Sequence, residues 1–256
     1  MDISTNIKVV IPARYGSSRL PGKPLLLICE KPIFWHVAQR CIEAGISIND
    51  IIIATDDMRI FDEANRLKLP VLMTSTEHQS GTDRINEVTS KLNWSLETIV
   101  LNVQGDEPLI PSKLIQALVS YVKKNPAYSI ATAVTPFTKY EDFINPNVVK
   151  AILGSQGRAL YFTRSASPFN RDNPNDISLA YRHIGIYAYT VESLNLFCSY
   201  PEAPLESYEK LEQLRALSNG LTIGACLFEQ QLPHGVDTLN DYEIIKKIME
   251  NNNANY

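Results

Sequence analysis

The chain has few of the features that mark disulfide-rich, zinc-binding or membrane-spanning proteins. Its four cysteines, Cys29, Cys41, Cys198 and Cys226, form no CxxC pair, and no histidine lies at ligand spacing from them. We therefore expect reduced, mostly buried thiols rather than a disulfide framework or a structural zinc site. No stretch approaches the ~20 apolar residues that a membrane helix needs. Membrane insertion is not expected.

Positive charge is also in short supply. The chain has 24 Lys and Arg against 28 Asp and Glu, which gives a formal net charge of −4. A nucleic-acid partner is not expected, because such proteins carry a basic face. Residues 1–8 lead directly into an apolar run, with no basic segment followed by a long apolar one, so no secretory signal is expected. With 256 residues, 45% of them hydrophobic, the chain is expected to be a cytoplasmic protein of one elaborated domain.

The first half alternates short apolar runs with helical patterns. The runs at residues 7–13, 51–55, 71–74 and 98–103 are rich in β-branched residues, as strands buried on both faces are. Helical patterns are expected from Phe34 to a cap at Gly45, over residues 56–67, and over residues 112–124. This alternation predicts an α/β fold with a Rossmann-like, mostly parallel sheet flanked by helices. Ligands of such sheets bind beyond the carboxyl ends of the strands.

The pattern changes after about residue 128. Residues 148–153 and 159–163 are expected to form a hairpin, residues 170–178 a surface loop, and residues 183–189 a strand. Leucines recur at helical spacing over residues 205–217, which predicts one helix there. A strand over residues 222–228 and a closing helix complete the chain. The second half therefore predicts an inserted mixed α/β sub-region within one domain.

The loop after the first strand, ARYGSSRLPGKPL, contains Gly16 and Gly22 and carries three cations: Arg14, Arg19 and Lys23. Such a segment can surround a triphosphate with amides and positive charges. A P-loop is excluded, because five residues rather than four separate Gly16 from Gly22 and Pro24 replaces the hydroxyl residue. A solvated basic turn remains the structural alternative. Lys23 is expected to be an exposed loop lysine that buries little on folding.

Two aspartates are candidates for a magnesium site. Asp106 follows the buried run 98–103, and Asp237 follows Gly235 and Val236. Magnesium favours a few carboxylates together with phosphate oxygens and water. Either aspartate could instead cap a helix. The pair Asp56-Asp57 suggests the DxD motif of glycosyltransferases, but its place at a helix start favours capping.

Several motifs, in order, cover nearly the whole chain. They are RYGSSRLPGKPL (14–25), HQSGTDR (78–84), NVQGDEP (102–108), HIGIYAY (183–189), LEQLR (211–215) and GVDT (235–238). Together they resemble the signature of the Kdo cytidylyltransferase (CMP-Kdo synthetase) family, where Kdo is 3-deoxy-D-manno-octulosonate. The related sialic-acid enzymes usually carry a lysine soon after the serine of the first motif.

The resemblance implies transfer of CMP from CTP to the anomeric hydroxyl of Kdo with release of pyrophosphate. It implies that residues 1–127 bind CTP and that residues 128–256 bind the sugar acid and form a homodimer. It also implies Mg²⁺ as the cofactor and a role in lipopolysaccharide or capsule synthesis. The 8-amino analogue of Kdo, or another sugar acid, remains an alternative acceptor.

The resemblance also assigns roles to individual residues. The catalytic residues would be Lys23, Arg14 and Asp106, with Asp106 and Asp237 as metal ligands. The nucleotide would be bound by Arg14, Ser17, Arg19, Lys23, Gln79, Ser80 and Gly81. The sugar would be bound by Arg84, Gln104, His183, Tyr187, Glu212 and Gln213. Positioning and charge neutralisation would supply most of the rate.

Two other classes of protein are alternatives to a cytidylyltransferase. A glycosyltransferase would use a nucleotide sugar and form no pyrophosphate. A non-catalytic nucleotide-binding module would not need the two distant aspartates, Asp106 and Asp237.

Overall fold

The computed structural model describes residues 7–16, 20–78, 80–230, 232 and 235–253. The chain divides into two compact units: Met1–Gln116 with Leu232–Tyr256, and Ala117–Gln231. The closing segment thus belongs with the first unit, whereas the resemblance assigned it to the sugar-acid half, residues 128–256. Among the described residues, no helix combines the length and apolar character needed to cross a bilayer.

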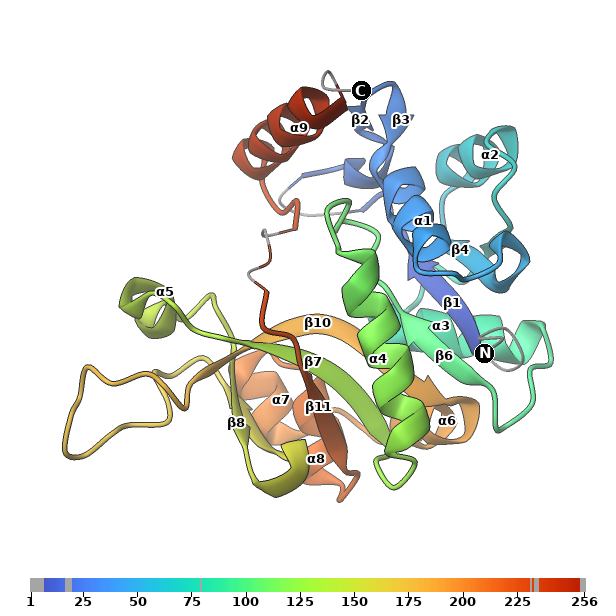
Figure 1. Ribbon diagram of the computed structural model, residues 1–256. Helices are drawn as coiled ribbons and strands as arrows, with labels where there is room; N and C mark the ends of the chain where they lie inside the picture. Colours follow the sequence, from blue (N-terminus) through green and yellow to red (C-terminus); the bar gives the residue numbers. More distant parts are fainter. Residues whose placement is uncertain (1–6, 17–19, 79, 231, 233–234, 254–256) are drawn as a thin grey trace. The chain divides into compact units, whose positions relative to one another are not determined.

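The first unit contains the predicted parallel sheet, with strand order β6-β1-β4-β5. Figure 1 labels β6, β1 and β4 of this sheet. Its strands are β1 (Ile7–Pro12), β4 (Ile51–Thr55), β5 (Val71–Met73) and β6 (Ile99–Asn102). The helices between them are α1 (Ile33–Glu43), α2 (Met58–Arg66) and α3 (Gly81–Lys91). Right-handed crossovers place α1 and α2 on one face and α3 on the other, because the chain reverses direction across the sheet after β5. The predicted α/β fold class is confirmed.

This reversal creates the place where a ligand is expected. From β1 the chain moves outward to β4 and β5, and then returns to β6 on the opposite side of β1. The loops that leave β1 and β6 therefore diverge and open a crevice at the carboxyl edge of the sheet. The loop after β1 carries Arg14 and Lys23, and the loop after β6 carries Gln104 and Asp106.

The C-terminal helix α9 (Leu239–Asn253) packs against β2 (Leu27–Ile28), which pairs antiparallel with β3 (Lys31–Pro32). Val236, Tyr242 and Ile245 are buried in one apolar cluster with Ile28 and Ile33. The Tyr242 hydroxyl donates to the Leu27 carbonyl oxygen at 2.6 Å. These contacts fix the segment before α9, which carries the GVDT motif, to the first unit.

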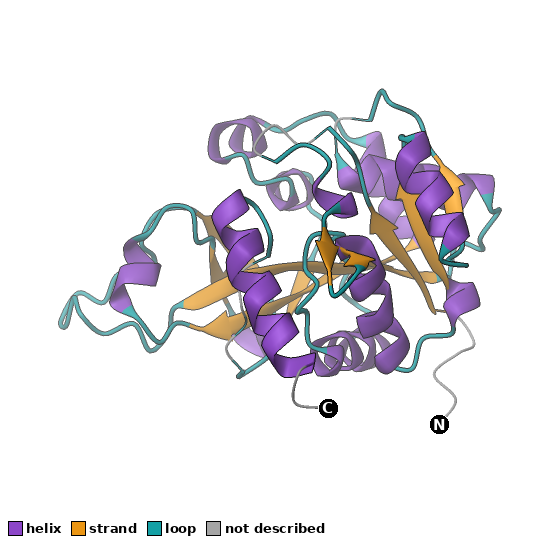
Figure 2. Ribbon diagram, turned by 90° about the horizontal axis from the view of Figure 1, so that it is seen from above, coloured by secondary structure: helices purple, strands orange, loops and turns teal. Residues whose placement is uncertain are grey.

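The second unit is mixed, as predicted. Strand β7 (Ile130–Pro136) pairs antiparallel with β10 (Tyr181–Thr190) and parallel with β11 (Ile223–Leu227). The predicted hairpin is formed by β8 (Lys150–Leu153) and β9 (Ala159–Thr163), and β8 also pairs with β10. Helices and strands are distinguished by colour in Figure 2. The remaining helices are α4 (Ser112–Lys124), which contains the boundary between the units, α5 (Tyr140–Ile144) and α6 (Val191–Ser199).

The single helix predicted over residues 205–217 is wrong. The segment forms two short helices, α7 (Pro204–Glu209) and α8 (Gln213–Ser218). Lys210 ends α7 in the left-handed region, with φ of 53°. Leucine spacing could not reveal this break. A buried ion pair joins the two short helices: Arg215 of α8 donates two hydrogen bonds to Glu206 of α7, at 2.7 and 2.9 Å.

Candidate active site

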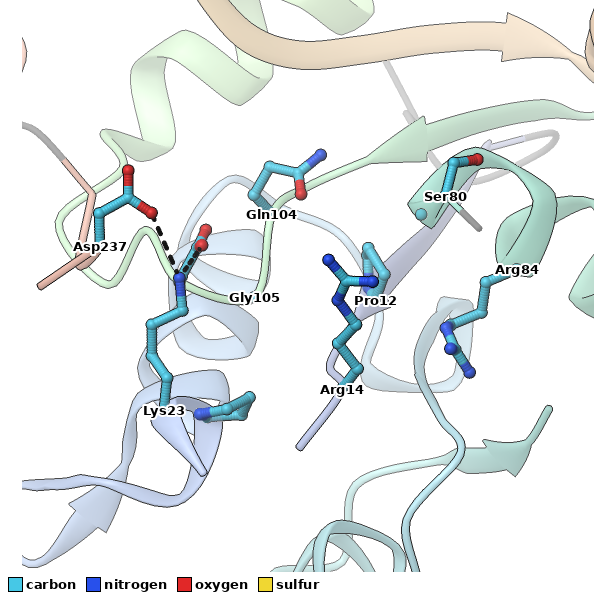
Figure 3. Close-up of a pocket in the computed structure, with 11 residues that line it drawn as sticks. Pro12, Arg14, Lys23, Ser80, Arg84, Gln104, Gly105 and Asp237 are labelled. Atoms are coloured by element: carbon cyan, nitrogen blue, oxygen red, sulfur yellow. Dashed lines mark hydrogen bonds and ion pairs between the residues drawn. The ribbon is translucent and has the colours of Figure 1, made fainter. Parts of the chain in front are cut away.

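A polar pocket of the first unit lies at the crevice between the loops that follow β1 and β6 (Figure 3). It is built from the two loops, the start of α3 and the segment before α9. Its lining residues are Pro12, Arg14, Lys23, Pro24, Ser80, Gly81, Arg84, Gln104, Gly105, Asp106 and Asp237. Eight of the site residues predicted from the sequence therefore share one pocket, although they come from four separate segments.

Lys23 lies between the two candidate metal ligands. Its Nζ is 2.5 Å from Asp106 Oδ2 and 3.5 Å from Asp237 Oδ1. The expectation that Lys23 is exposed is wrong, because only 8% of the residue is accessible to solvent. The side chains of Asp106 and Asp237 remain 31% and 50% exposed. The pocket thus presents two carboxylates that converge on one point and are neutralised there by a cation.

The backbone explains how Asp237 reaches Asp106. The Val236 N–H donates to the Asp106 carbonyl oxygen at 2.8 Å, and the Val236 side chain is fully buried. Thr238, the next residue, caps α9: its hydroxyl accepts from the Asp241 N–H at 3.2 Å, and Asp241 accepts from the Thr238 N–H at 2.8 Å. Thr238, rather than Asp237, therefore caps α9, and the Asp237 carboxylate faces Lys23.

Gly105 allows the loop after β6 to approach β1. A Cβ at this position would lie 2.6 Å from the Pro12 carbonyl oxygen and 3.4 Å from the Ile11 side chain.

Because backbone cannot yield as a flexible side chain does, Gly105→Ala must displace the loop that carries Asp106. We expect the free energy of unfolding to fall by about 1–3 kcal/mol. Urea denaturation measures this loss. Gly45→Ala is not a suitable control, because Gly45 has φ of 91°, where an alanine is itself strained. Gly16→Ala is the matched variant, since no atom lies within 4 Å of its added Cβ. Equal stability of the two variants would contradict the close approach.

The α3 side of the pocket is formed by Ser80 and Gly81. Ser80 caps α3, and its Oγ accepts from the Asp83 N–H at 3.1 Å. Arg84 lines the pocket but is only 2% exposed, and its guanidinium donates to Asp56 Oδ2 at 2.7 Å and to Thr74 Oγ1. The first aspartate of the Asp56-Asp57 pair thus pairs with a buried arginine. The second, Asp57, caps α2 by accepting from the Arg59 N–H at 2.9 Å. Capping, rather than a DxD motif, accounts for Asp57.

The second unit contains the other predicted sugar-binding residues, His183, Tyr187, Glu212 and Gln213. On β10, the rings of His183 and Tyr187 lie 5.5 Å apart, and the charge of Glu212 acts on Tyr187. Burial, followed by the charge of Arg182, lowers the pKa of His183 to about 3. Burial raises the pKa of Tyr187 well above its usual value. Both rings are therefore neutral at pH 7, and His183 shares a hydrogen bond of 3.0 Å with Thr132 Oγ1. The buried Nε2 of Gln213 has no hydrogen-bond partner among the residues that the structure describes.

Comparisons with known proteins identify the family of this chain. The family model for cytidylyltransferases matches residues 8–223. The 3-deoxy-manno-octulosonate cytidylyltransferase of Cellvibrio japonicus is 46% identical over 250 residues, which cover 94% of this chain and 97% of that protein. The second such enzyme of Paraburkholderia phytofirmans is 42% identical over 95% of this chain and 94% of its own. This chain belongs to the 3-deoxy-manno-octulosonate cytidylyltransferase family.

A solved structure of this family is similar throughout. The CMP:2-keto-3-deoxy-manno-octonic acid synthetase complexed with CTP is 36% identical, with a TM-score of 0.89, and the match covers 97% of this chain and 100% of that one. Membership of this cytidylyltransferase family makes the protein a nucleotidyltransferase, as the sequence motifs predicted.

Some predicted residues of the cytidylyltransferase site are not tested by the structure. Ser17, Arg19 and Gln79 lie outside the described residues. Arg14 is exposed at the pocket. Gln104 lines the pocket, and its Nε2 donates to Asn102 Oδ1 at 3.1 Å. Substrate contacts of these residues, and of the sugar-binding candidates, stay predictions.

Sequence reasoning missed residues that hold the site together. Val236 and Gly105 bring the two aspartate loops to each other and to β1. Glu87, on α3, binds the loop that precedes Ser80. A signal for Glu87 was present in the helical spacing of Arg84, Glu87 and Lys91, which places all three on one face of α3.

Proposed function

We propose that this protein transfers CMP from CTP to the anomeric hydroxyl of Kdo and releases pyrophosphate. The family supplies the reaction class. The observation that carries the proposal is the position of Lys23 between Asp106 and Asp237, in a pocket at the switch point of the parallel sheet. A cation beside two carboxylates suits a substrate that carries phosphate charge and brings a divalent ion with it.

We propose Mg²⁺ as the cofactor, held by Asp106 and Asp237. The donor set fits this ion: both ligands offer carboxylate oxygens, and both side chains are partly exposed. The described residues contain no cluster of three or more His, Cys, Asp or Glu that could hold a metal unaided. Two carboxylates completed by phosphate oxygens and water are a usual magnesium set. When bound, the ion would neutralise charge on the phosphates and make the sugar hydroxyl more acidic.

The chain's own residues would act mainly by position and charge. In the step, a bond forms between the anomeric oxygen and the α-phosphorus, and the bond from that phosphorus to the β-phosphate oxygen breaks. Pyrophosphate leaves with the electron pair, and the hydroxyl proton passes to solvent. Lys23 and Arg14 would stabilise the charge that grows on the phosphate oxygens. Ser80 and Gly81, at the start of α3, would place amide dipoles near the nucleotide.

Sugar recognition is assigned to Gln104 and Arg84 of the first unit and to His183, Tyr187, Glu212 and Gln213 of the second. Because His183 is neutral, its role would be hydrogen bonding to a hydroxyl rather than charge pairing with the carboxylate. The buried amide of Gln213 is a further donor suited to a polyhydroxylated ligand.

We further propose a cytoplasmic homodimer that supplies activated sugar for lipopolysaccharide or capsule synthesis. None of the four described cysteines forms a disulfide, which suits a reducing compartment. Size-exclusion chromatography with light scattering tests the dimer.

A panel of CTP, ATP, GTP and UTP crossed with Kdo, 8-amino-Kdo and sialic acid tests the proposal. We expect pyrophosphate release to require a sugar acid and to favour CTP with Kdo by ~10-fold or more in kcat/KM, since a site that hydrogen-bonds one base leaves polar groups unpaired with another. A continuous pyrophosphate assay reads every combination. Equal turnover with ATP would contradict the nucleotide assignment, and a preference for 8-amino-Kdo would reassign the acceptor.

A further inference from the structure

The loop between β5 and α3 is fastened by three side chains from one face of α3. Arg84, Glu87 and Lys91 are spaced by three and four residues, so they follow one another along the helix surface. Arg84 reaches Thr74 and the Ser75 carbonyl oxygen. Lys91 donates to the Met73 carbonyl oxygen at 2.9 Å.

Glu87 is the centre of this set. Its Oε2 accepts from the Ser75 N–H at 2.8 Å and lies 2.5 Å from His78 Nε2, while its Oε1 lies 2.7 Å from Lys91 Nζ. Against the opposing effect of burial, the hydrogen bonds from Lys91, Ser75 and His78 lower the pKa of Glu87 to about 2. The carboxylate is therefore ionised at any pH used for assay, and it binds both ends of residues 75–78.

The held segment leads directly into the pocket. Residues 75–78 precede Ser80 and Gly81, which line the pocket and begin α3. Glu87 itself is not one of the residues that line the pocket. Its carboxylate instead binds Ser75 and His78, in the segment that precedes the lining residues Ser80 and Gly81.

We propose that Glu87 is a positioning residue for nucleotide binding, which holds the loop before α3 in the conformation that receives CTP. The inference rests on the proposed function, because it takes CTP as the ligand of this pocket. Without the carboxylate the loop would sample other conformations, and CTP would have to select the competent one. The apparent Kd rises in proportion as the competent fraction falls, so a loop that is competent one-tenth of the time weakens binding about 10-fold.

The test compares Glu87→Gln with Glu63→Gln. Glu63 forms a similar bidentate ion pair with Arg66, at 2.6 and 2.7 Å, on α2 of the same unit, and these hydrogen bonds do not involve the loop before α3. We expect Glu87→Gln to raise the Kd and KM for CTP about 10-fold, with kcat at saturation within about 2-fold of wild type. Glu63→Gln is expected to change neither. Calorimetric titration of CTP, with calcium in place of magnesium, measures binding without turnover.

Hydrogen exchange of the unliganded protein gives a second readout. The Ser75 amide donates to Glu87, so its exchange should quicken in Glu87→Gln and not in Glu63→Gln. Glu87→Asp, which keeps the charge but shortens the reach, repeats both measurements if Glu87→Gln fails to fold. Unchanged CTP affinity and unchanged Ser75 exchange would overturn the proposal, as would a fall in kcat with KM unaltered. Wild-type protein that neither binds nor turns over CTP would instead refute the proposed function.

Discussion

Replacing Lys23 with methionine is expected to lower turnover by ~10²-fold or more, the scale seen when a donor to transition-state charge is lost. Methionine keeps most of the aliphatic volume of this buried residue and removes only the charge. Steady-state pyrophosphate release at saturating CTP and Kdo measures the effect. Lys68→Met, at an exposed lysine of the same unit, is the control and should match wild type. Near-normal turnover of Lys23→Met would remove Lys23 from the phosphate site.

The same substitution should have the opposite effect on metal binding without nucleotide. The Lys23 ammonium is 2.5 Å from Asp106 and 3.5 Å from Asp237, so it competes with a divalent ion for the same oxygens. Its removal leaves two carboxylates facing each other, which costs about 1 kcal/mol of stability at this partly exposed site. A divalent ion would relieve that repulsion. Titration of Mn²⁺ followed by electron paramagnetic resonance should therefore show tighter binding to Lys23→Met than to wild type. Weaker binding would show that Lys23 supports the metal site rather than competing for it.

Asp106→Asn and Asp237→Asn are each expected to raise the magnesium concentration needed for half-maximal rate by ~10-fold or more. The scale is that of losing a group that supports a metal site. If both carboxylates bind one ion, the double variant should lose less free energy of activation than the two single variants together, because the second change acts on a damaged site. Magnesium titrations of the three variants give the coupling.

Two control variants make this result specific. Asp62→Asn removes an exposed carboxylate of the same unit and should leave the magnesium requirement unchanged. Thr238→Ala removes the cap of α9 and should lower stability by about 1 kcal/mol, again without altering the magnesium requirement. A silent Asp237→Asn would leave Asp106 as the sole protein carboxylate on the metal. Strict additivity would place the two aspartates at separate sites.

The parallel sheet could be predicted because its strands are buried on both faces. Runs such as residues 7–13 and 51–55 must be apolar throughout, and this pattern is local. The pocket followed, since side chains just after such strands must lie at the carboxyl edge of the sheet. Arg14, Lys23 and Asp106 were selected in this way, and the resemblance placed both Asp106 and Asp237 on the metal.

What could not be predicted depends on contacts between distant segments. The burial of Lys23 follows from two aspartates supplied by other loops, and Asp237 reaches Asp106 through the Val236 N–H. Strand β7 was not anticipated, and the break at Lys210 was hidden by regular leucine spacing. Each of these features is set by tertiary packing, which overrides local pattern.

We conclude that the protein transfers a nucleotidyl group rather than a phosphoryl group. Phosphorus-31 NMR of a reaction containing CTP, Kdo and magnesium tests it most directly, because it identifies every phosphorus product at once. We expect pyrophosphate and one phosphodiester, CMP joined to the sugar, in equal amounts. CDP together with a sugar phosphate monoester, or CTP left unchanged in the presence of Kdo, would contradict it.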